Sequence, residues 1–553
     1  MRYIPSKITA LAAAVILGVT GCADLDVANP NAPDADLALS RASDVETLIR
    51  GSYRQWWSSS HSPTSGAFVF ANMSFQMSSW PANFGMVAGS RLPRQPVNNV
   101  GLDEFYDEFL EAPWRLNYRA LSAVAQGLRA LEDPDIAAGL GDDLLRAQAF
   151  ARFMQGLGHG SIALFYGQGH IVDETKQLVD EDNFPIEQPL VSYEELLQAS
   201  LGYFDQAIAL AESGDFTLPS SWMSVAVTSD ELARIAHSMK ARYRANVART
   251  PAEREAVDWN AVIADVDAGV QNGWNKQYDG WLAGTWWNGM LGYNSLSWIG
   301  WNQESMMITG MADQSGNYQE WLSVMPPENR EPDLPSGEPF LIVSPDQRFA
   351  QGETMAEQEA NQTAGTMIQI NGGPFVPPNN WGQPARGMHR WSYYRNNTGD
   401  THIFFGEMSH PEITTHEMRL LKAEGYYRLG NAAAAADLIN VTRVGVGGLS
   451  PADPAAANDG NDSCVPRLPD GTCGDLLEML KWEKRLHTRT LGVHSNTWYF
   501  DGRGWGDLYA GTPLELPVPC DENQAFGRPC ENTGGVGGSS AAAGSVYNWP
   551  GEL

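Results

Sequence analysis

Residues 414–443 constrain the fold more than any other part of the chain. Small or apolar residues recur there at helical spacing on both sides of one glycine: Ala423, Tyr426, Gly430, Ala435 and Ile439. Small side chains let two helices approach closely, and a glycine can occupy the turn between them. The segment therefore predicts an antiparallel pair of packed helices. The alternative is a chance helix pair with no repeat around it.

Helices are predicted in other parts of the chain as well. A Ser or Thr followed three residues later by Glu forms a capping box, which marks a helix start. Four such pairs are Ser43–Glu46, Ser192–Glu195, Thr228–Glu231 and Thr414–Glu417. Apolar residues at three- and four-residue spacing predict two buried stripes: Leu144, Ala147, Ala151, Met154 and Gly158, then Leu197, Leu201, Phe204, Ile208 and Ala211. The fold class is therefore mainly α.

The spacing in 414–443 also matches a tetratricopeptide unit, although no period of about 34 residues runs through the rest of the chain. The predicted architecture is a degenerate tetratricopeptide-like scaffold interrupted by long loops. These loops are 62–100, 168–190, 274–410, 446–472 and 509–553. Loops of this length carry binding or other functional surfaces when they are ordered. Because 274–410 is rich in aromatic residues, we expect it to pack on the helical body.

The N-terminus is predicted to be a lipoprotein signal peptide, residues 1–21. Arg2 and Lys7 precede a short apolar run, 8–19, which ends in Val19-Thr20-Gly21-Cys22. This ending resembles a lipobox, in which the cysteine receives a diacylglyceryl group and becomes the first mature residue. Several acyl chains give durable membrane anchoring. The alternative is an ordinary secretory signal with a chance cysteine.

The other cysteines agree with export from the cytoplasm. Cys464, Cys473, Cys520 and Cys530 form two close pairs, and an oxidising compartment would pair them. The pairing Cys464–Cys473 and Cys520–Cys530 is the most economical of three possible connectivities. The net charge of −30 excludes nucleic acid as a partner, because like charges repel. No segment outside the signal peptide is long and apolar enough to span a membrane.

Several motifs, taken in order, resemble the SusD/RagB family. They run from the mature start at Cys22–Asn31 through 145–167 and 192–211 to Leu420-Leu-Lys-Ala-Glu-Gly-Tyr-Tyr-Arg-Leu-Gly-Asn431. They continue with Glu483-Lys-Arg485, Trp498-Tyr-Phe-Asp501, Leu516-Pro-Val-Pro519 and Tyr547-Asn-Trp-Pro-Gly551. The sequence departs from the family pattern at His487, where an acid is common, and at Gly502 and Gly504. The resemblance covers nearly the whole mature chain.

The resemblance implies one SusD/RagB-like domain over 22–553. It would contain a helical body, a Trp-rich insertion at about 274–410 and a loop-rich C-terminal segment at 446–553. The family also implies a surface-exposed position on the outer membrane. Its members act as partners of a SusC-like TonB-dependent transporter, and their loops form the ligand surface. The loops of this chain carry no family motif, so the resemblance leaves the ligand open.

Motifs for catalysis and metal binding are mostly absent from the sequence. His416-Glu417 lacks the second His of a zinc protease helix, and 156–160 lacks the strand that precedes a dinucleotide loop. Paired acids for glycoside hydrolysis stay open, because their separation is spatial. Residues 458–462, Asn-Asp-Gly-Asn-Asp, could hold a structural calcium ion, and the alternative is a polar turn. We therefore expect no cofactor and no metal.

The best candidate for ligand binding is the aromatic cluster between Trp274 and Trp301. Tryptophan faces stack on sugar rings, and Asn amides meet sugar hydroxyls. The candidate residues are Trp286, Trp287, Asn288, Tyr293, Asn294, Trp298 and Trp301, with Trp80 in a second, weaker group. The alternative is that most of these tryptophans hold the loop on the body.

These features predict a non-enzymatic lipoprotein that binds a small neutral nutrient, an oligosaccharide in the first instance. It would deliver this ligand to the SusC-like transporter. Two other readings stay open: a surface-anchored hydrolase acting on glycan or peptide, and a tetratricopeptide-type scaffold that binds proteins.

Overall fold

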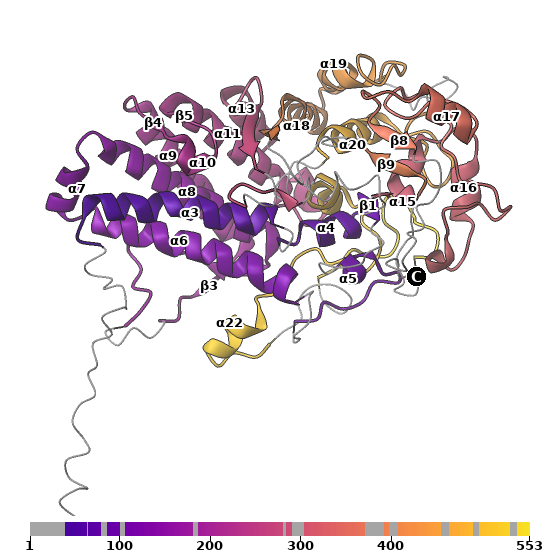
Figure 1. Cartoon of the computed structure of the whole chain (residues 1–553). Helices are drawn as coiled ribbons and strands as arrows, with labels where there is room; N and C mark the ends of the chain where they lie inside the picture. Colours follow the sequence, from indigo (N-terminus) through magenta and orange to yellow (C-terminus); the bar gives the residue numbers. More distant parts are fainter. Residues whose placement is uncertain are drawn as a thin grey trace, which may run out of the picture.

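The computed structural model is mainly helical, as predicted (Figure 1). It describes residues 39–62, 65–78, 86–99, 106–180, 186–279, 284–289, 303–370, 392–397, 408–454, 464–489, 497–530 and 539–552. Cys22 and the signal peptide lie outside these residues. None of the helices within them is both long enough and apolar enough to cross a membrane.

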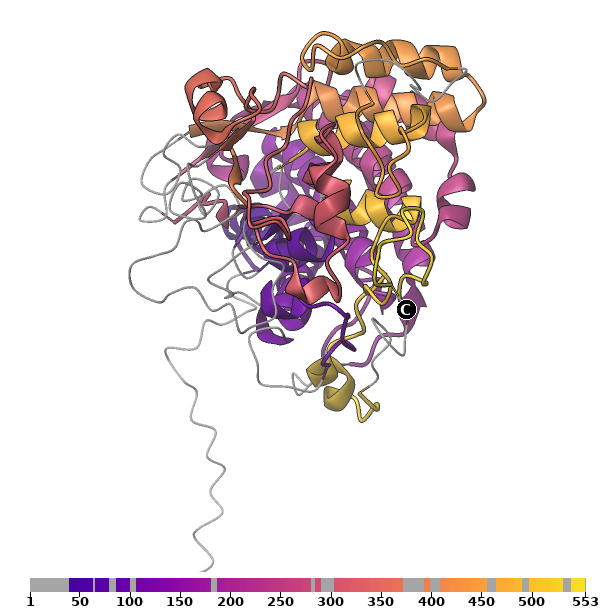
Figure 2. The same ribbon diagram turned by 90° about the vertical axis from the view of Figure 1, so that its right-hand side faces the viewer.

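The body is a series of long helices in which each helix packs on its neighbour. They are α3 (Ala42–His61), α6 (Ala112–Ala130), α8 (Asp143–Phe165), α9 (Tyr193–Glu212), α11 (Ser229–Asn246), α13 (Trp259–Ala268), α18 (Thr415–Arg428), α19 (Ala432–Arg443) and α20 (Leu476–His487). Contacts run from α3 through α6, α8, α9, α11 and α13 to α18, which then packs on α19 and α20. Figure 2 shows α18, α19 and α20 as a layer at the top of the molecule. Helical repeat proteins share this neighbour-to-neighbour packing; the tetratricopeptide assignment itself stays a prediction.

Shorter elements connect these helices. The short helices are α4 (Ala67–Met73), α5 (Met86–Ser90), η1 (Tyr106–Glu111), α7 (Pro134–Leu140), α10 (Ser220–Met223), α12 (Pro251–Glu255), α15 (Met306–Thr309), η3 (Gly310–Ala312), α16 (Asn317–Leu322), η4 (Pro327–Asn329), α17 (Met355–Asn361), η7 (Thr497–Asp501), α21 (Gly502–Trp505) and α22 (Cys520–Ala525). The strands form antiparallel pairs: β1 (Met77–Ser78) with β7 (Gln303–Glu304), β2 (Gln168–His170) with β3 (Leu190–Ser192), β4 (Thr217–Leu218) with β5 (Val227–Thr228), β6 (Trp274–Tyr278) with β10 (Met408–Ile413), and β8 (Ile368–Ile370) with β9 (Tyr394–Asn396).

The predicted helix starts are correct at three of the four positions. Ser192 and Thr228 make complete capping boxes, and Thr414 accepts the backbone N–H of Glu417. The prediction at Ser43 is wrong, because the N-cap position of α3 is Arg41, two residues earlier. Ala42 packs against Gly139 of α7, a tertiary contact that local sequence does not reveal.

The predicted helix pair at 414–443 is confirmed as α18 and α19. Gly430 adopts a left-handed φ of 80° in the turn between them, and the side chain of Asn431 caps α19. Ala423, Ala435 and Ile439 are fully buried. The two alanines are small and let the helices pack closely, as the sequence predicted.

Three of the predicted loops contain helices, so these parts of the prediction are wrong: 62–100 contains α4 and α5, 274–410 contains α15, α16 and α17, and 509–553 contains α22. Every residue of α4 is buried. A short apolar run has no polar face, so its periodicity does not distinguish a helix from a loop or strand. The insertion at 274–410 does pack on the body. Its described residues form a second apolar core with Trp482 of α20 and with Trp498 and Trp549 from the C-terminal part.

Both predicted disulfides are present. Cys464 is bonded to Cys473 with a Cα–Cα distance of 5.0 Å, and Cys520 to Cys530 with 4.8 Å. The second bond ties α22 to the chain that follows it. Figure 1 shows α22 at the lower edge of the molecule, near α6.

Several residues of the family-like motifs meet in a buried ion network. Arg254 of α12 donates to both carboxylate oxygens of Glu424 in α18, at 2.9 and 2.6 Å, and to Asp501 of η7 at 2.6 Å. Lys484 of α20 is 2.7 Å from the other oxygen of Asp501. All four side chains are at most 2% exposed. The network links four elements that are distant in sequence.

Helix α8 contains a buried histidine that is held in its neutral form. Nδ1 of His159 donates to the carbonyl of Gln155 at 2.7 Å, and Nε2 accepts the backbone N–H of Val172 at 3.0 Å. Protonation would place a second N–H against that donor. Burial lowers the pKa of His159 to about 4, although the Gln155 carbonyl and Asp173 act to raise it.

We expect His159→Gln to reduce the acid sensitivity of the fold. The folded pKa lies below the usual 6.5, so the unfolded state takes up the proton first as the pH falls. The contribution of His159 is complete above pH 6.5 and is lost, by about 3 kcal/mol, as the pH falls to 4. Urea unfolding of both proteins at pH 7 and pH 4 checks this: the stability advantage of the wild type should shrink by that amount. An unchanged difference would contradict it.

Candidate functional site

The first part of the Trp-rich insertion forms an aromatic box around a buried lysine. Lys276 lies in β6, is fully buried and donates to the hydroxyl of Tyr53 at 2.5 Å. Its Nζ lies 4.1 Å from the ring centroid of Tyr53, 4.3 Å from that of Trp57, 5.1 Å from that of Trp274 and 5.3 Å from that of Trp286. Aromatic faces attract an ammonium group. The box therefore fastens β6 to helix α3.

The electrostatics of the box depend on Glu412. Burial lowers the pKa of Lys276 well below its ordinary value, and the charge of Glu412 acts in the opposite direction. Burial would raise the pKa of Glu412, but His61 at 2.9 Å and the charges of Arg242 and Lys276 lower it overall. Glu412 therefore stays ionised inside the body. Lys276, Tyr53 and Trp57 are buried, so the centre of the box is structural, whereas the rings of Trp274 and Trp286 are only half-buried.

The segment 284–289 is held on the body mainly through its backbone. Nη2 of Arg54 donates to the carbonyl of Gly284 at 2.6 Å, and Nε1 of Trp57 donates to that of Trp287 at 3.2 Å. The carboxylate of Asp279 accepts the backbone N–H groups of Thr285 and Trp286. Main-chain contacts of this kind fix a loop without using its side chains.

The three described candidate residues differ in burial. Trp286 is half-buried, with its ring 5.9 Å from Tyr53 and 5.8 Å from Trp57. Trp287 is also half-buried, whereas Asn288 is fully buried. Trp286 and Trp287 thus keep part of their surface exposed, and Asn288 does not. The candidates Trp80, Tyr293, Asn294, Trp298 and Trp301 lie outside the described residues.

The pairing of β1 with β7 brings together two segments that are distant in the sequence. Ser78 at the end of β1 pairs with Gln303 at the start of β7. In the sequence, Trp80 stands two positions after Ser78 and Trp301 two positions before Gln303. Strand β7 also contacts β9. The described chain thus stops next to Ser78 and resumes at Gln303 in one antiparallel strand pair.

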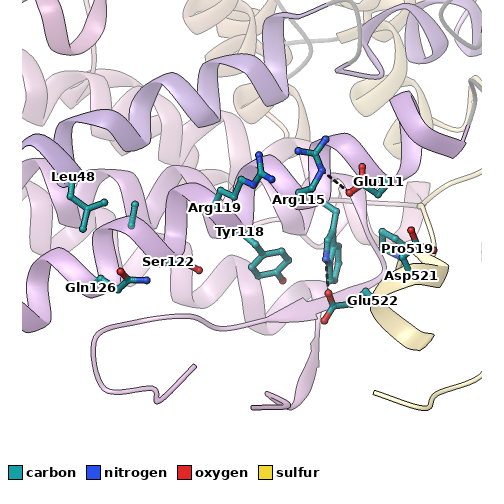
Figure 3. Close-up of a pocket in the computed structure, with 12 residues that line it drawn as sticks. Leu48, Glu111, Arg115, Tyr118, Arg119, Ser122, Gln126, Pro519, Asp521 and Glu522 are labelled. Atoms are coloured by element: carbon teal, nitrogen blue, oxygen red, sulfur yellow. Dashed lines mark hydrogen bonds and ion pairs between the residues drawn. The ribbon is translucent and has the colours of Figure 1, made fainter. Parts of the chain in front are cut away.

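A second feature, which the sequence analysis missed, is an open groove between α6 and α22, here called the α6 groove. Its volume is about 560 Å³, within the usual range for ligand sites. Its lining includes Leu48, Glu111, Trp114, Arg115, Tyr118, Arg119, Ser122, Gln126, Asp521 and Glu522. Figure 3 shows Arg115 and Arg119 along one margin and Tyr118 and Glu522 along the other. The sequence did contain a signal for this groove: Arg115, Arg119, Ser122 and Gln126 recur at helical spacing beside Trp114 and Tyr118.

One wall of the α6 groove is held by Glu522 of α22. Its carboxylate accepts from Nε1 of Trp114 at 3.4 Å and lies 3.2 Å from Nε2 of His170. Burial would raise the pKa of Glu522, but the hydrogen bond and charge of His170 lower it overall. A glycoside hydrolase needs one carboxyl group with a raised pKa as its proton donor. Glu522 does not fit that role.

Metal binding was a further possibility. Among the described residues, no three His, Cys, Asp or Glu side chains gather in a way that could hold a metal ion. The calcium candidate at 458–462 lies outside these residues.

Comparison with known proteins gives similarity to solved structures only. No family model and no curated protein matches the chain. A SusD-like protein of Bacteroides fragilis is 15% identical, with a TM-score of 0.48, over 85% of this chain and 87% of its own. A SusD superfamily protein of Bacteroides vulgatus is 11% identical, with a TM-score of 0.48, over 85% and 89%.

A SusD-like carbohydrate binding protein, also of Bacteroides vulgatus, is 13% identical, with a TM-score of 0.43, over 86% of both chains. The chain is similar to solved SusD-like structures over most of its length, at low sequence identity.

Proposed function

We propose that the chain is a SusD/RagB-type lipoprotein that binds a neutral oligosaccharide at the outer surface of the outer membrane. It is anchored through acylated Cys22 and passes its ligand to a SusC-like TonB-dependent transporter. Its ligand surface is built from Trp286, Trp287 and the candidates Trp80, Tyr293, Asn294, Trp298 and Trp301, and it needs no cofactor.

The observation that carries this proposal is the pairing of β1 with β7. The sequence predicted two separate aromatic groups: the main one between Trp274 and Trp301, and a weaker one at Trp80. The register Ser78↔Gln303 places the described ends of both segments side by side on a helical body. Loops that leave a rigid scaffold at one place are the usual way in which proteins build a binding surface.

The chemistry of these residues favours a sugar. Tryptophan and tyrosine rings stack on the apolar face of a pyranose, and Asn and Gln amides pair with its hydroxyls. The charge of −30 disfavours a polyanionic ligand. Half-buried Trp286 and Trp287 are held by backbone contacts, so their exposed surfaces are already positioned for stacking.

Titration calorimetry against maltohexaose, cellohexaose, xylohexaose and mannohexaose tests this proposal. We expect at least one of them to bind. Alanine at Trp286, Trp287 or Trp298 should weaken that binding by about 1–3 kcal/mol wherever the ring stacks on the sugar. Melting temperatures of the same variants separate a binding effect from a packing effect.

Trp274→Ala provides a matched control. This ring is half-buried in β6, and its strand neighbour is Ile413, so the variant should lower thermal stability and leave affinity unchanged. If every variant with weak binding also melts early, the ligand surface lies elsewhere. Shorter sugars released from a hexasaccharide would instead identify a hydrolase.

A further inference from the structure

We propose that the α6 groove is a second carbohydrate site, which takes a linear neutral oligosaccharide independently of the Trp-rich insertion. The ligand class in this inference, a neutral oligosaccharide, rests on the proposed function. The α6 groove itself lies apart from the Trp-rich insertion. Leu48, which lines the groove, and Trp57, which holds the insertion, lie nine residues apart on α3. That spacing corresponds to about 14 Å along the helix axis.

The shape of the groove suits a chain-like ligand. Arg115, Arg119, Ser122 and Gln126 follow one another at four-, three- and four-residue steps, so they form one stripe along α6. The stripe from Arg115 to Gln126 is about 16 Å long. An open trough of this length can hold several linked sugar rings, whereas a compact metabolite would leave most of it empty.

The margin of the groove that carries Tyr118 offers an aromatic surface that is already fixed. Trp114 is only 4% exposed and serves as a base, while Tyr118 is half-buried and shows part of its ring. The two ring centroids are 4.7 Å apart. The hydroxyl of Tyr118 accepts the backbone N–H of His170 at 2.6 Å and lies 3.3 Å from its carbonyl. A ring held in this way loses little conformational entropy when a sugar stacks on it.

The charges of the groove favour a neutral ligand rich in hydroxyls. Arg115 pairs with Glu111 at 2.7 Å, and exposed Arg119 has no hydrogen-bond or ion-pair partner among the described residues. Asp521 is exposed on the opposite wall, beside Glu522. The lining thus carries two arginines and three acidic side chains, and this mixture neither attracts nor repels a neutral ligand at long range. Guanidinium and carboxylate groups each present paired sites that match adjacent hydroxyls.

The structure favours a glycan over a peptide in this place. An extended peptide commonly docks by adding a strand to a free sheet edge. The described lining of the α6 groove comes from α3, η1, α6, α22 and Pro519, and none of it is a strand. Recognition would therefore depend on side chains, which is how hydroxyl-bearing ligands are held.

Calorimetry with the same four hexasaccharides tests the groove. Ser122→Trp places a bulky side chain in the trough, and Arg119→Ala removes an exposed group whose loss should leave the fold intact. We expect the wild type to bind two oligosaccharides per chain and Ser122→Trp to bind one. Arg119→Ala should weaken the groove site about tenfold, as expected for one hydrogen bond to a charged group.

Arg234→Ala is the matched control. Its guanidinium is 47% exposed on α11 and pairs only with Asp230 among the described residues, so this variant should bind like the wild type. One ligand per wild-type chain, unaffected by Ser122→Trp and Arg119→Ala, overturns the second site and leaves the proposed function standing. Loss of all binding in a Ser122→Trp variant that melts like the wild type would overturn two independent sites and place the ligand surface in the groove alone. If none of the four sugars binds the wild type, both proposals fail.

Discussion

Glu424→Ala is expected to lower the free energy of unfolding by about 3–5 kcal/mol. The substitution leaves Arg254 and Lys484 in the interior with only Asp501 to balance them. It also removes the acceptor for Nε1 of Trp505, which lies 2.9 Å from Glu424. Leaving one charge of a buried ion pair without its partner destabilises the fold by far more free energy than the intact pair contributes. Chemical denaturation of the two proteins at neutral pH measures the difference.

A double-mutant cycle with Arg254 sharpens this expectation. Arg254→Ala alone should cost a similar amount, but the double variant should cost clearly less than the sum, because no Arg254–Glu424 partner is then left unpaired. Asp230→Ala in an exposed pair on α11 is the control and should change stability by less than about 0.5 kcal/mol. Additive losses at Arg254 and Glu424 would show that the two groups act independently.

The network explains why these residues stand out in the sequence. Glu424 belongs to the motif at 420–431, Lys484 to Glu483-Lys-Arg485, and Asp501 to Trp498-Tyr-Phe-Asp501. Each motif supplies one charge to a shared interior contact between α18, α20, η7 and α12. Glu483 forms a second buried ion pair, because its carboxylate accepts from the guanidinium of Arg348 at 2.6 and 2.9 Å. These motifs specify packing of the scaffold, and none of these charges is exposed to a ligand.

Local signals in the sequence were sufficient to predict helices α8, α9, α11, α18 and α19 and the two disulfides. The capping boxes at Ser192 and Thr228 and the glycine turn at 430 depend on residues within a few positions of one another. Long-range contacts were beyond such reasoning. Tyr53 and Lys276 are 223 residues apart in sequence, and a lysine between tryptophan and tyrosine gives no sign that it will be buried in a box.

For the candidate site, too, local features could be predicted from the sequence and long-range contacts could not. Composition alone identified the Trp-rich segment, because tryptophan is rare and was concentrated there. Burial of Asn288 could not be foreseen, because it depends on how α3 and β6 enclose the segment. The α6 groove was missed because its second wall, Asp521 and Glu522, stands some 400 residues after α6 in the chain.

Trp57→Ala should destabilise the fold by about 3–5 kcal/mol, the cost of removing a fully buried tryptophan. This side chain is 1% exposed and stacks on His61 with a centroid distance of 3.7 Å and an interplanar angle of 4°. It also packs edge-on against Trp286 and donates to the carbonyl of Trp287. Both the aromatic box and the start of the Trp-rich insertion therefore depend on it.

The conservative variant Trp57→Phe separates anchoring from packing. It keeps an aromatic ring in the box and removes the hydrogen bond to Trp287, so it should cost much less stability than Trp57→Ala. If Trp286 and Trp287 stack on the ligand, loosening their backbone should still weaken binding of the hexasaccharide, because positioning is lost. Melting temperature and calorimetric affinity of both variants distinguish the cases. Unchanged affinity in Trp57→Phe, together with unchanged affinity in Trp286→Ala, would mean that this part of the insertion only fastens the chain to α3.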